Sequence, residues 1–180
     1  YKNGLFGFQV SAITNGPGGA SQQMLSYNSS SENAPELAKK INSIQKYFVE
    51  ETRLGIPLLF FDEALHGLLR DNATSFPQAI ALAATFDTIL MHQVANAIAD
   101  ETKQRGIRQI LTPVVNLASD VRWGRTEETY GEDPFLTSEM AVAFVSAFEK
   151  KNIITTPKHF VANVGDGGRD SYPIYLSERF

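Results

Sequence analysis

Short apolar runs alternate with helix-like stripes of apolar residues along this chain of 180 residues, and no other sequence feature restricts the fold as strongly. The runs have the length of β-strands and cover residues 5–10, 56–61, 107–115 and 153–156. Between them, apolar residues recur every three or four positions in segments that begin near Pro35, Asp87 and Asp133. Strands that alternate with helices predict an α/β fold with a parallel sheet and right-handed crossovers.

Each helical segment carries one apolar stripe that we expect to be buried. The first stripe consists of Leu37, Ile41, Ile44 and Phe48, and Gly55 ends its segment. The second stripe consists of Leu90, Val94, Ala97 and Ile98, with Asp87 as the expected N-cap and Gly106 at the end. The third stripe consists of Met140, Phe144, Val145 and Phe148.

Two architectures fit this alternation. Four strand–helix units are half of an eight-unit barrel, whose usual length is ~250 residues. The alternative is an open doubly wound sheet, which normally has a glycine-rich phosphate turn after its first strand. The segment Gly16-Pro17-Gly18-Gly19 matches that turn poorly, because its spacing is wrong and proline has no N–H. We therefore predict an α/β fold that forms the first half of a (β/α)8 TIM-type barrel.

The ends of the chain point to a larger protein. The sequence begins at Tyr1 and closes on residues 176–180, which read as the start of a helix. We therefore expect residues 1–180 to be the N-terminal portion of a barrel domain, whose second half and a following domain lie elsewhere.

The composition and the motifs exclude several classes of function. Of all residues, 43% are hydrophobic and 20% are charged, with a net charge of −4, so neither a disordered tail nor a strongly basic nucleic-acid module fits. The absence of cysteine excludes disulfides, thiolate metal sites and a cysteine nucleophile. The sequence has no zinc-type His-x-x-x-His, no P-loop and no Gly-x-Ser-x-Gly. We expect no metal, no cofactor, no nucleic acid and no membrane span.

Charged residues gather after the predicted strands, where the active site of a barrel lies. They are Asp62, Glu63 and His66 after the second strand, then Asp120, Arg122, Trp123, Arg125, Glu127 and Glu128, and finally Lys158, His159, Asp166, Arg169 and Asp170. The turns before the strands are ordinary, with Gly55, Gly106 and Asn152 at their ends. Carboxylates accept hydrogen bonds from sugar hydroxyls, whereas Lys, Arg and His donate to them, so this set suits a hydroxyl-rich ligand.

Several of these residues also have structural interpretations. Glu63 could cap the segment after its strand, and His66 more often would be a structural hydrogen-bonding histidine. One of Arg122 and Arg125 could pair with Glu127, Glu128 or Glu132, and we expect at least one of the two arginines to be structural. Lys158 follows a buried strand and needs a carboxylate or a substrate oxygen, because an unpaired buried ammonium is costly. His159 reaches the same pocket only if the backbone turns there.

Four motifs resemble the N-terminal barrel domain of glycoside hydrolase family 3, which includes β-glucosidases and β-xylosidases. They are Glu63-Ala64-Leu65-His66-Gly67, Phe76-Pro77-Gln78-Ala79, the segment from Arg122 to Pro134 (RWGRTEETYGEDP) and Lys158-His159-Phe160. Their order and spacing match over roughly residues 50–180. The resemblance implies a retaining glycosidase, in which one carboxylate attacks the anomeric carbon and another acts as acid and then base.

The resemblance also implies which side chains bind the sugar in the −1 subsite. Glu63 matches the carboxylate that binds sugar hydroxyls; Asp is frequent there in β-glucosidases and Glu in xylosidase-like members. Arg125, Lys158 and His159 match the basic ligands, and Arg169 matches a further arginine of many β-glucosidases.

The catalytic carboxylates are expected outside this chain. Ser119-Asp120-Val121 is not the nucleophile motif of the family, because that motif is Ser-Asp-Trp-like and follows a later strand. Asp170-Ser171-Tyr172 lacks the histidine of the N-acetylglucosaminidase branch.

Two other functions remain open at this stage. One is a Schiff-base barrel lyase or aldolase that uses Lys158. The other is a non-catalytic half-barrel that binds sugar or a partner. For the glycosidase, the expected partners are a β-linked glycoside and the remainder of the same enzyme, covalent or as another chain. Family habit makes a secreted or periplasmic location the expectation.

Overall fold

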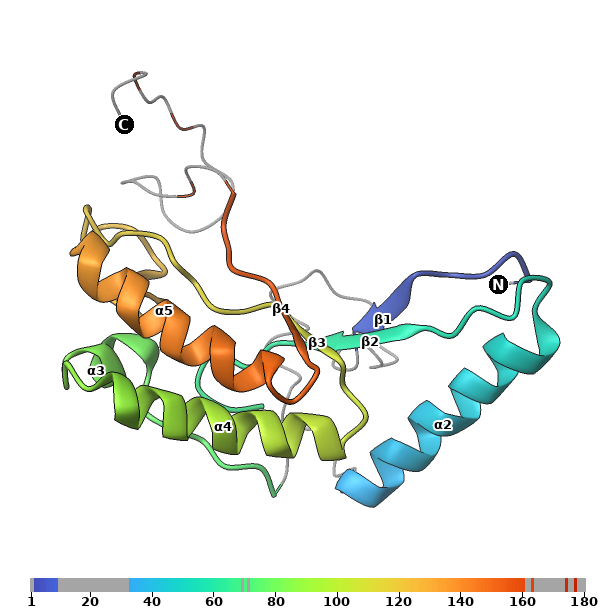
Figure 1. The fold of residues 1–180 in the computed structure, drawn as a ribbon. Helices are drawn as coiled ribbons and strands as arrows, with labels where there is room; N and C mark the ends of the chain where they lie inside the picture. The colour runs from blue at the N-terminus through green and yellow to red at the C-terminus, as the bar shows by residue number, and fades with distance from the viewer. Residues whose placement is uncertain are drawn as a thin grey trace.

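A computed structural model describes residues 2–9, 33–68, 70, 72–160, 163, 174 and 177. The predicted loop at Gly16-Pro17-Gly18-Gly19, the candidate ligand Arg169 and the segment Asp170-Ser171-Tyr172 lie outside the described residues. Within the described part, strands and helices alternate as the sequence predicts (Figure 1).

The sheet contains four parallel strands in the order β1-β2-β3-β4, namely β1 (Gly7–Gln9), β2 (Leu59–Asp62), β3 (Gln109–Ile110) and β4 (Ile154–Thr155). Each strand pairs with the next strand of the chain, with Phe8 opposite Phe60 and Asp62 opposite Ile110. A doubly wound sheet would reverse its strand order, whereas a barrel adds each new strand on the same side. The observed order is therefore that of a barrel segment, and the α/β prediction is confirmed.

The third apolar run forms a shorter regular strand than its length suggests. Pro113 has no N–H to donate, so the regular ladder ends after Ile110. Backbone pairing nevertheless continues irregularly toward the carboxyl end. Lys158 N donates to the Pro113 carbonyl over 3.0 Å, and Val115 N donates to the Lys158 carbonyl over 2.9 Å. Lys158 is thereby held at the carboxyl-end rim of the sheet.

Three helices begin where local side chains cap them. In α2 (Ala34–Glu51), Asn33 and Glu36 form a reciprocal capping box. In α4 (Thr88–Gln104) and α5 (Pro134–Glu149), the side chains of Asp87 and Asp133 accept hydrogen bonds from Leu90 N and Leu136 N. The Asp87 N-cap and the helix start at Asp133-Pro134 are confirmed.

The buried faces agree with three of the four predicted residues in α2 and in α5, and with two of the four in α4. Leu37, Ile41 and Phe48 are buried in α2, and Met140, Phe144 and Phe148 are buried in α5. In α4 the prediction was right for Val94 and Ile98 but wrong for Leu90 and Ala97, which are exposed. The buried face of α4, which packs against α5, consists of Met91, Val94, Ala95, Ile98, Ala99 and Thr102. Alanines on that face allow α4 and α5 to lie side by side (Figure 1).

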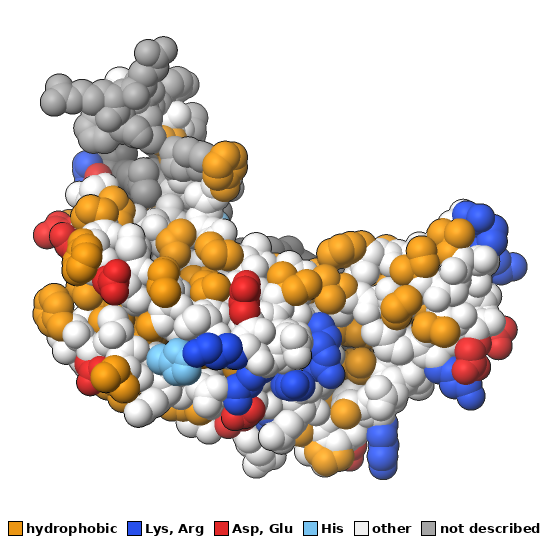
Figure 2. Space-filling model, viewed as in Figure 1, with side chains coloured by type: hydrophobic (Ala, Val, Ile, Leu, Met, Phe, Trp, Pro, Cys, Tyr) orange, Lys and Arg blue, Asp and Glu red, His pale blue; other side chains and the backbone are white. Residues whose placement is uncertain are grey.

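Two elements were not predicted, because they are too short to show a periodic pattern of apolar residues in the sequence. They are α3 (Ala79–Ala83) and the 3-10 turn η3 (Thr126–Glu128), which pack against each other. The core joins β2, β3 and all the helices, with Phe60, Ile110, Phe144 and Phe148 nearly inaccessible to solvent. Figure 2 shows that apolar side chains also remain on the outer surface, where Phe86, Ile89, Phe135 and Val142 are exposed.

Candidate active site

Glu63 and Lys158 meet at the carboxyl-end rim although 95 positions separate them in the sequence. Lys158 Nζ donates to both oxygens of the Glu63 carboxylate, over 2.8 and 3.1 Å. Side-chain exposure is 15% for Lys158 and 33% for Glu63, so the pair is partly open to solvent. The prediction that Lys158 requires a carboxylate or a substrate oxygen is confirmed, and the partner is Glu63.

A buried ion pair fixes the backbone directly before Glu63. Asp62 ends β2, is 1% exposed and accepts hydrogen bonds from Glu63 N over 2.9 Å and from Arg70 Nη2 over 2.5 Å. Asp62 also lies opposite Ile110 in the sheet, so β3 holds its backbone while Arg70 holds its side chain. The strand end that carries Glu63 is therefore held in place by charge-assisted hydrogen bonds.

Arg125 and Glu128 form a second ion pair at the rim, within and next to η3. Arg125 Nε donates to Glu128 Oε1 over 2.8 Å, and Nη2 donates to Oε2 over 2.7 Å. The two side chains are 10% and 7% exposed. Arg125 therefore pairs with Glu128, one of the three glutamates named as possible partners of the two arginines.

The electrostatics connect the two pairs. Burial raises the pKa of the Glu63 carboxyl above its usual value, while the positive charge of Lys158 opposes that rise. Smaller effects come from Glu128, which raises the pKa of Glu63, and from Arg125, which lowers it. Two carboxylates and two cations therefore act on one another at this rim, and their formal charges cancel.

His159 follows Lys158 through a cis peptide bond, so the extended backbone does not continue between them. Its backbone N donates to Asn116 Oδ1 over 3.0 Å, and its ring Nδ1 lies 2.9 Å from the same oxygen. Asn116 belongs to the loop after β3, and its Nδ2 donates to the Asn163 carbonyl over 3.0 Å. The loops after β3 and β4 are thus joined through His159 and Asn116.

The remaining residues of the predicted rim have structural contacts. His66 Nδ1 lies 2.9 Å from the Phe76 carbonyl, as expected for a structural hydrogen-bonding histidine. Asp120 accepts hydrogen bonds from the backbone and side chain of Arg122, and these lower the pKa of Asp120 to about 2. Trp123 is 3% exposed and packs inward. Arg169 lies outside the described residues.

Sequence reasoning named Glu63, Arg125, Lys158 and His159 as candidates but missed how they are supported. Asn116, Asp62 and Arg70 were not selected as partners, because each contact is formed only by folding. Glu128 was considered only as a structural partner of a nearby arginine. Its three-residue spacing from Arg125 was the available signal, since such residues are neighbours in a helical turn.

No cluster of three metal-ligating side chains occurs among the described residues. In the described part of the chain, no helix has both the length and the apolar character needed to cross a membrane.

The fold and the rim define a barrel-type α/β domain with a charge-balanced polar site at the carboxyl ends of its parallel strands. The family profile described as the glycosyl hydrolase family 3 N terminal domain matches residues 3–175, and the chain belongs to this family. Membership confirms the resemblance inferred from the four motifs.

Individual relatives agree with this membership. A β-xylosidase from Formosa agariphila is 38% identical over 139 residues, which are 69% of this chain and 19% of the relative. β-Glucosidase C from Emericella nidulans is 33% identical over 171 residues, which are 86% of this chain and 28% of the relative. The chain therefore spans less than a third of the length of these relatives.

Solved structures give the same result. A β-glucosidase from Erythrobacter marinus superposes with a TM-score of 0.69 at 39% identity, covering 73% of this chain and 19% of that structure. A β-glucosidase from Listeria innocua, solved with isofagomine, gives a TM-score of 0.63 at 34% identity, covering 70% and 18%.

Proposed function

We propose that this chain supplies the −1 sugar subsite of a retaining, exo-acting β-glycosidase. The observation that carries the proposal is the Glu63–Lys158 pair at the carboxyl-end rim, with Arg125 close enough to affect the Glu63 carboxyl. A carboxylate that accepts and an ammonium that donates suit adjacent hydroxyls of a sugar ring. Family membership supports β-glucosides or β-xylosides as substrates, since relatives of both kinds match the chain.

In this proposal residues of this chain position the sugar, and other parts of the enzyme supply the bond-breaking groups. Glu63 accepts from hydroxyls, whereas Lys158, Arg125, His159 and Arg169 donate to them. These hydrogen bonds strengthen as charge develops in the transition state. The nucleophile and the acid/base come from outside residues 1–180, so the partner of this half-barrel is the remainder of the same enzyme. We extend the proposal to a secreted or periplasmic location.

Schiff-base chemistry on Lys158 has less support. Such a nucleophile must be available as the neutral amine. Here Lys158 Nζ is held by hydrogen bonds to both carboxylate oxygens of Glu63, and this contact opposes its attack on a carbonyl carbon. Borohydride treatment of the protein with a carbonyl substrate should leave Lys158 unmodified.

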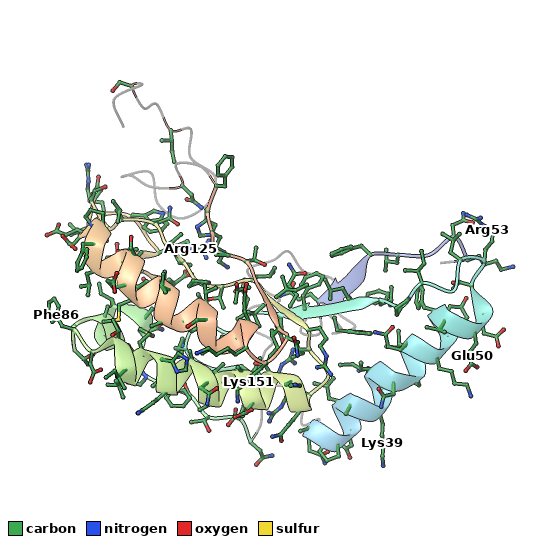
Figure 3. All side chains as sticks on the ribbon, in the orientation of Figure 1. Lys39, Glu50, Arg53, Phe86, Arg125 and Lys151 are labelled. Atoms are coloured by element: carbon green, nitrogen blue, oxygen red, sulfur yellow. The ribbon has the colours of Figure 1, made fainter. Side chains whose placement is uncertain are left out.

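The proposal is tested with Glu63→Ala and Lys158→Ala in the full-length enzyme. Each variant should lower kcat/KM for an aryl β-glucoside or β-xyloside by about 100- to 1000-fold, the usual cost of losing one strong transition-state contact. Lys151→Ala is the matched control, because Lys151 pairs with Asp100 on the outer helices. In Figure 3, Arg125 lies above α5 and Lys151 lies below it, next to α4. Wild-type kinetics for both rim variants would refute the assignment.

A further inference from the structure

Glu128 is more deeply buried than is usual for a glutamate on a surface turn. It is 5% exposed, and it lies three residues from Arg125, which is 8% exposed. Both oxygens of its carboxylate accept hydrogen bonds from the same guanidinium, over 2.8 and 2.7 Å. A two-point contact between planar groups fixes the plane of the guanidinium as well as its distance.

The backbone around Glu128 is itself held by several contacts. Glu128 N donates to the Arg125 carbonyl over 3.1 Å, and Thr126 Oγ1 donates to the Trp123 carbonyl over 2.9 Å. Thr129 Oγ1 closes the turn by donating to the Thr126 carbonyl over 2.8 Å. The short helix α3 packs against η3 from the other side. The carboxylate therefore has a fixed position from which to orient Arg125.

The two bonds to Glu128 engage Nε and Nη2 of Arg125, which form one edge of the guanidinium. Arg125 and Glu128 both lie close enough to Glu63 to affect its carboxyl electrostatically, in opposite directions. Glu128 therefore offsets the charge of Arg125 next to the sugar site. An arginine with a fixed plane and an offset charge is suited to donate hydrogen bonds to an uncharged ligand.

We propose that Glu128 is a positioning residue of the −1 subsite, which fixes the Arg125 guanidinium in the orientation that binds the sugar. This inference rests on the proposed glycosidase function and adds a residue that acts through Arg125 without touching the substrate.

The test compares Glu128→Gln and Glu128→Asp in the full-length enzyme with Glu139→Gln as the control. Glu139 is an exposed glutamate of α5 that does not belong to the rim. Glu128→Gln should lower kcat/KM for an aryl β-glycoside by about 10- to 100-fold, as expected when a binding group is misplaced by about 1 Å. Most of the loss should appear in kcat, since a contact that strengthens in the transition state is weakened. Glu139→Gln should remain within about twofold of the wild type.

Two further measurements separate positioning from a purely structural role. In an Arg125→Gln background, Glu128→Gln should cause little additional loss, because its effect passes through Arg125. The proposal would be overturned if the losses in kcat/KM from the two substitutions were additive. It would also be overturned if Glu128→Gln lowered the Tm but left the kinetics unchanged. Glu128→Asp retains the charge, so it provides a folded variant if Glu128→Gln does not fold. Its shorter side chain should still lower kcat/KM.

A crystal structure of the Glu128 variant tests the inference independently of activity. The Arg125 guanidinium should rotate or shift by about 1 Å or more relative to the wild type. An unchanged guanidinium position would contradict the positioning role, even in an active enzyme. If the wild-type enzyme cleaves neither aryl β-glucosides nor aryl β-xylosides, the proposed function fails, and the guanidinium position still decides the structural claim.

Discussion

Two opposing effects act on the pKa of the Glu63 carboxyl group. Burial disfavours its charged form and raises its pKa, whereas Lys158 donates to both oxygens and favours the charge. The sequence motifs identified Glu63 and Lys158 as candidates, because a motif records the type of residue at each position. The motifs could not show that the two residues pair with each other, because that contact joins the ends of β2 and β4.

The raised pKa of Glu63 predicts a pH-dependent contribution to stability. Because the folded-state pKa lies above the ordinary value of 4.5, the folded protein binds this proton more tightly than the unfolded chain does. The stabilisation is complete below about pH 4.5 and is lost as the pH rises through the folded-state pKa. The Tm of the wild-type enzyme should therefore fall relative to that of Glu63→Gln as the pH rises above about 4.5. A constant difference in Tm over this range would contradict the predicted shift.

At the level of elements, the helix starts were predictable because capping is local chemistry. Asp87 and Asp133 each precede an apolar stripe, and each side chain accepts a hydrogen bond from a backbone N–H three residues later. The register of the buried face was less predictable. Leu90 and Ala97 fit the helical period, yet packing against α5 buries Met91 and Ala95 instead. The turn η3 was missed because three residues contain less than one period.

The cap of α5 gives a prediction at this scale. Asp133 Oδ1 accepts from Leu136 N over 2.6 Å at an exposed helix start. Asp133→Ala should destabilise the domain by about 1 kcal/mol, because one backbone donor loses its partner and the negative charge at the helix N-terminus is lost. Thermal unfolding of the variant measures the effect. Glu139→Ala, an exposed change on the same helix, is the control and should leave Tm nearly unchanged.

For the whole molecule, the fold class followed from the alternation of strands and helices, which requires no knowledge of individual contacts. The strand bounds did not follow. Residues 107–115 are apolar throughout, but only Gln109–Ile110 form regular strand, since Pro113 interrupts the ladder. The number of units was also informative, because four sequentially ordered parallel strands account for half of an eight-stranded barrel.

The proposal that the catalytic carboxyl groups lie outside residues 1–180 predicts the behaviour of the isolated chain. A retaining glycosidase needs two carboxyl groups about 5–5.5 Å apart on either side of the scissile bond. In our proposal this chain supplies neither group. The purified 180-residue chain should therefore release no product from an aryl β-glycoside, while the full-length enzyme does. Turnover by the purified chain that disappears in its Glu63→Ala variant would disprove this prediction.

The strand order β1-β2-β3-β4 also bears on how such a domain folds while it is being synthesised. Each strand pairs with the one synthesised just before it, so the sheet can grow in the direction in which the ribosome delivers the chain. Glu63 emerges early and Lys158 emerges 95 residues later, when β4 has been added beside β3. The Glu63–Lys158 ion pair can therefore form only after the fourth strand lies beside the third.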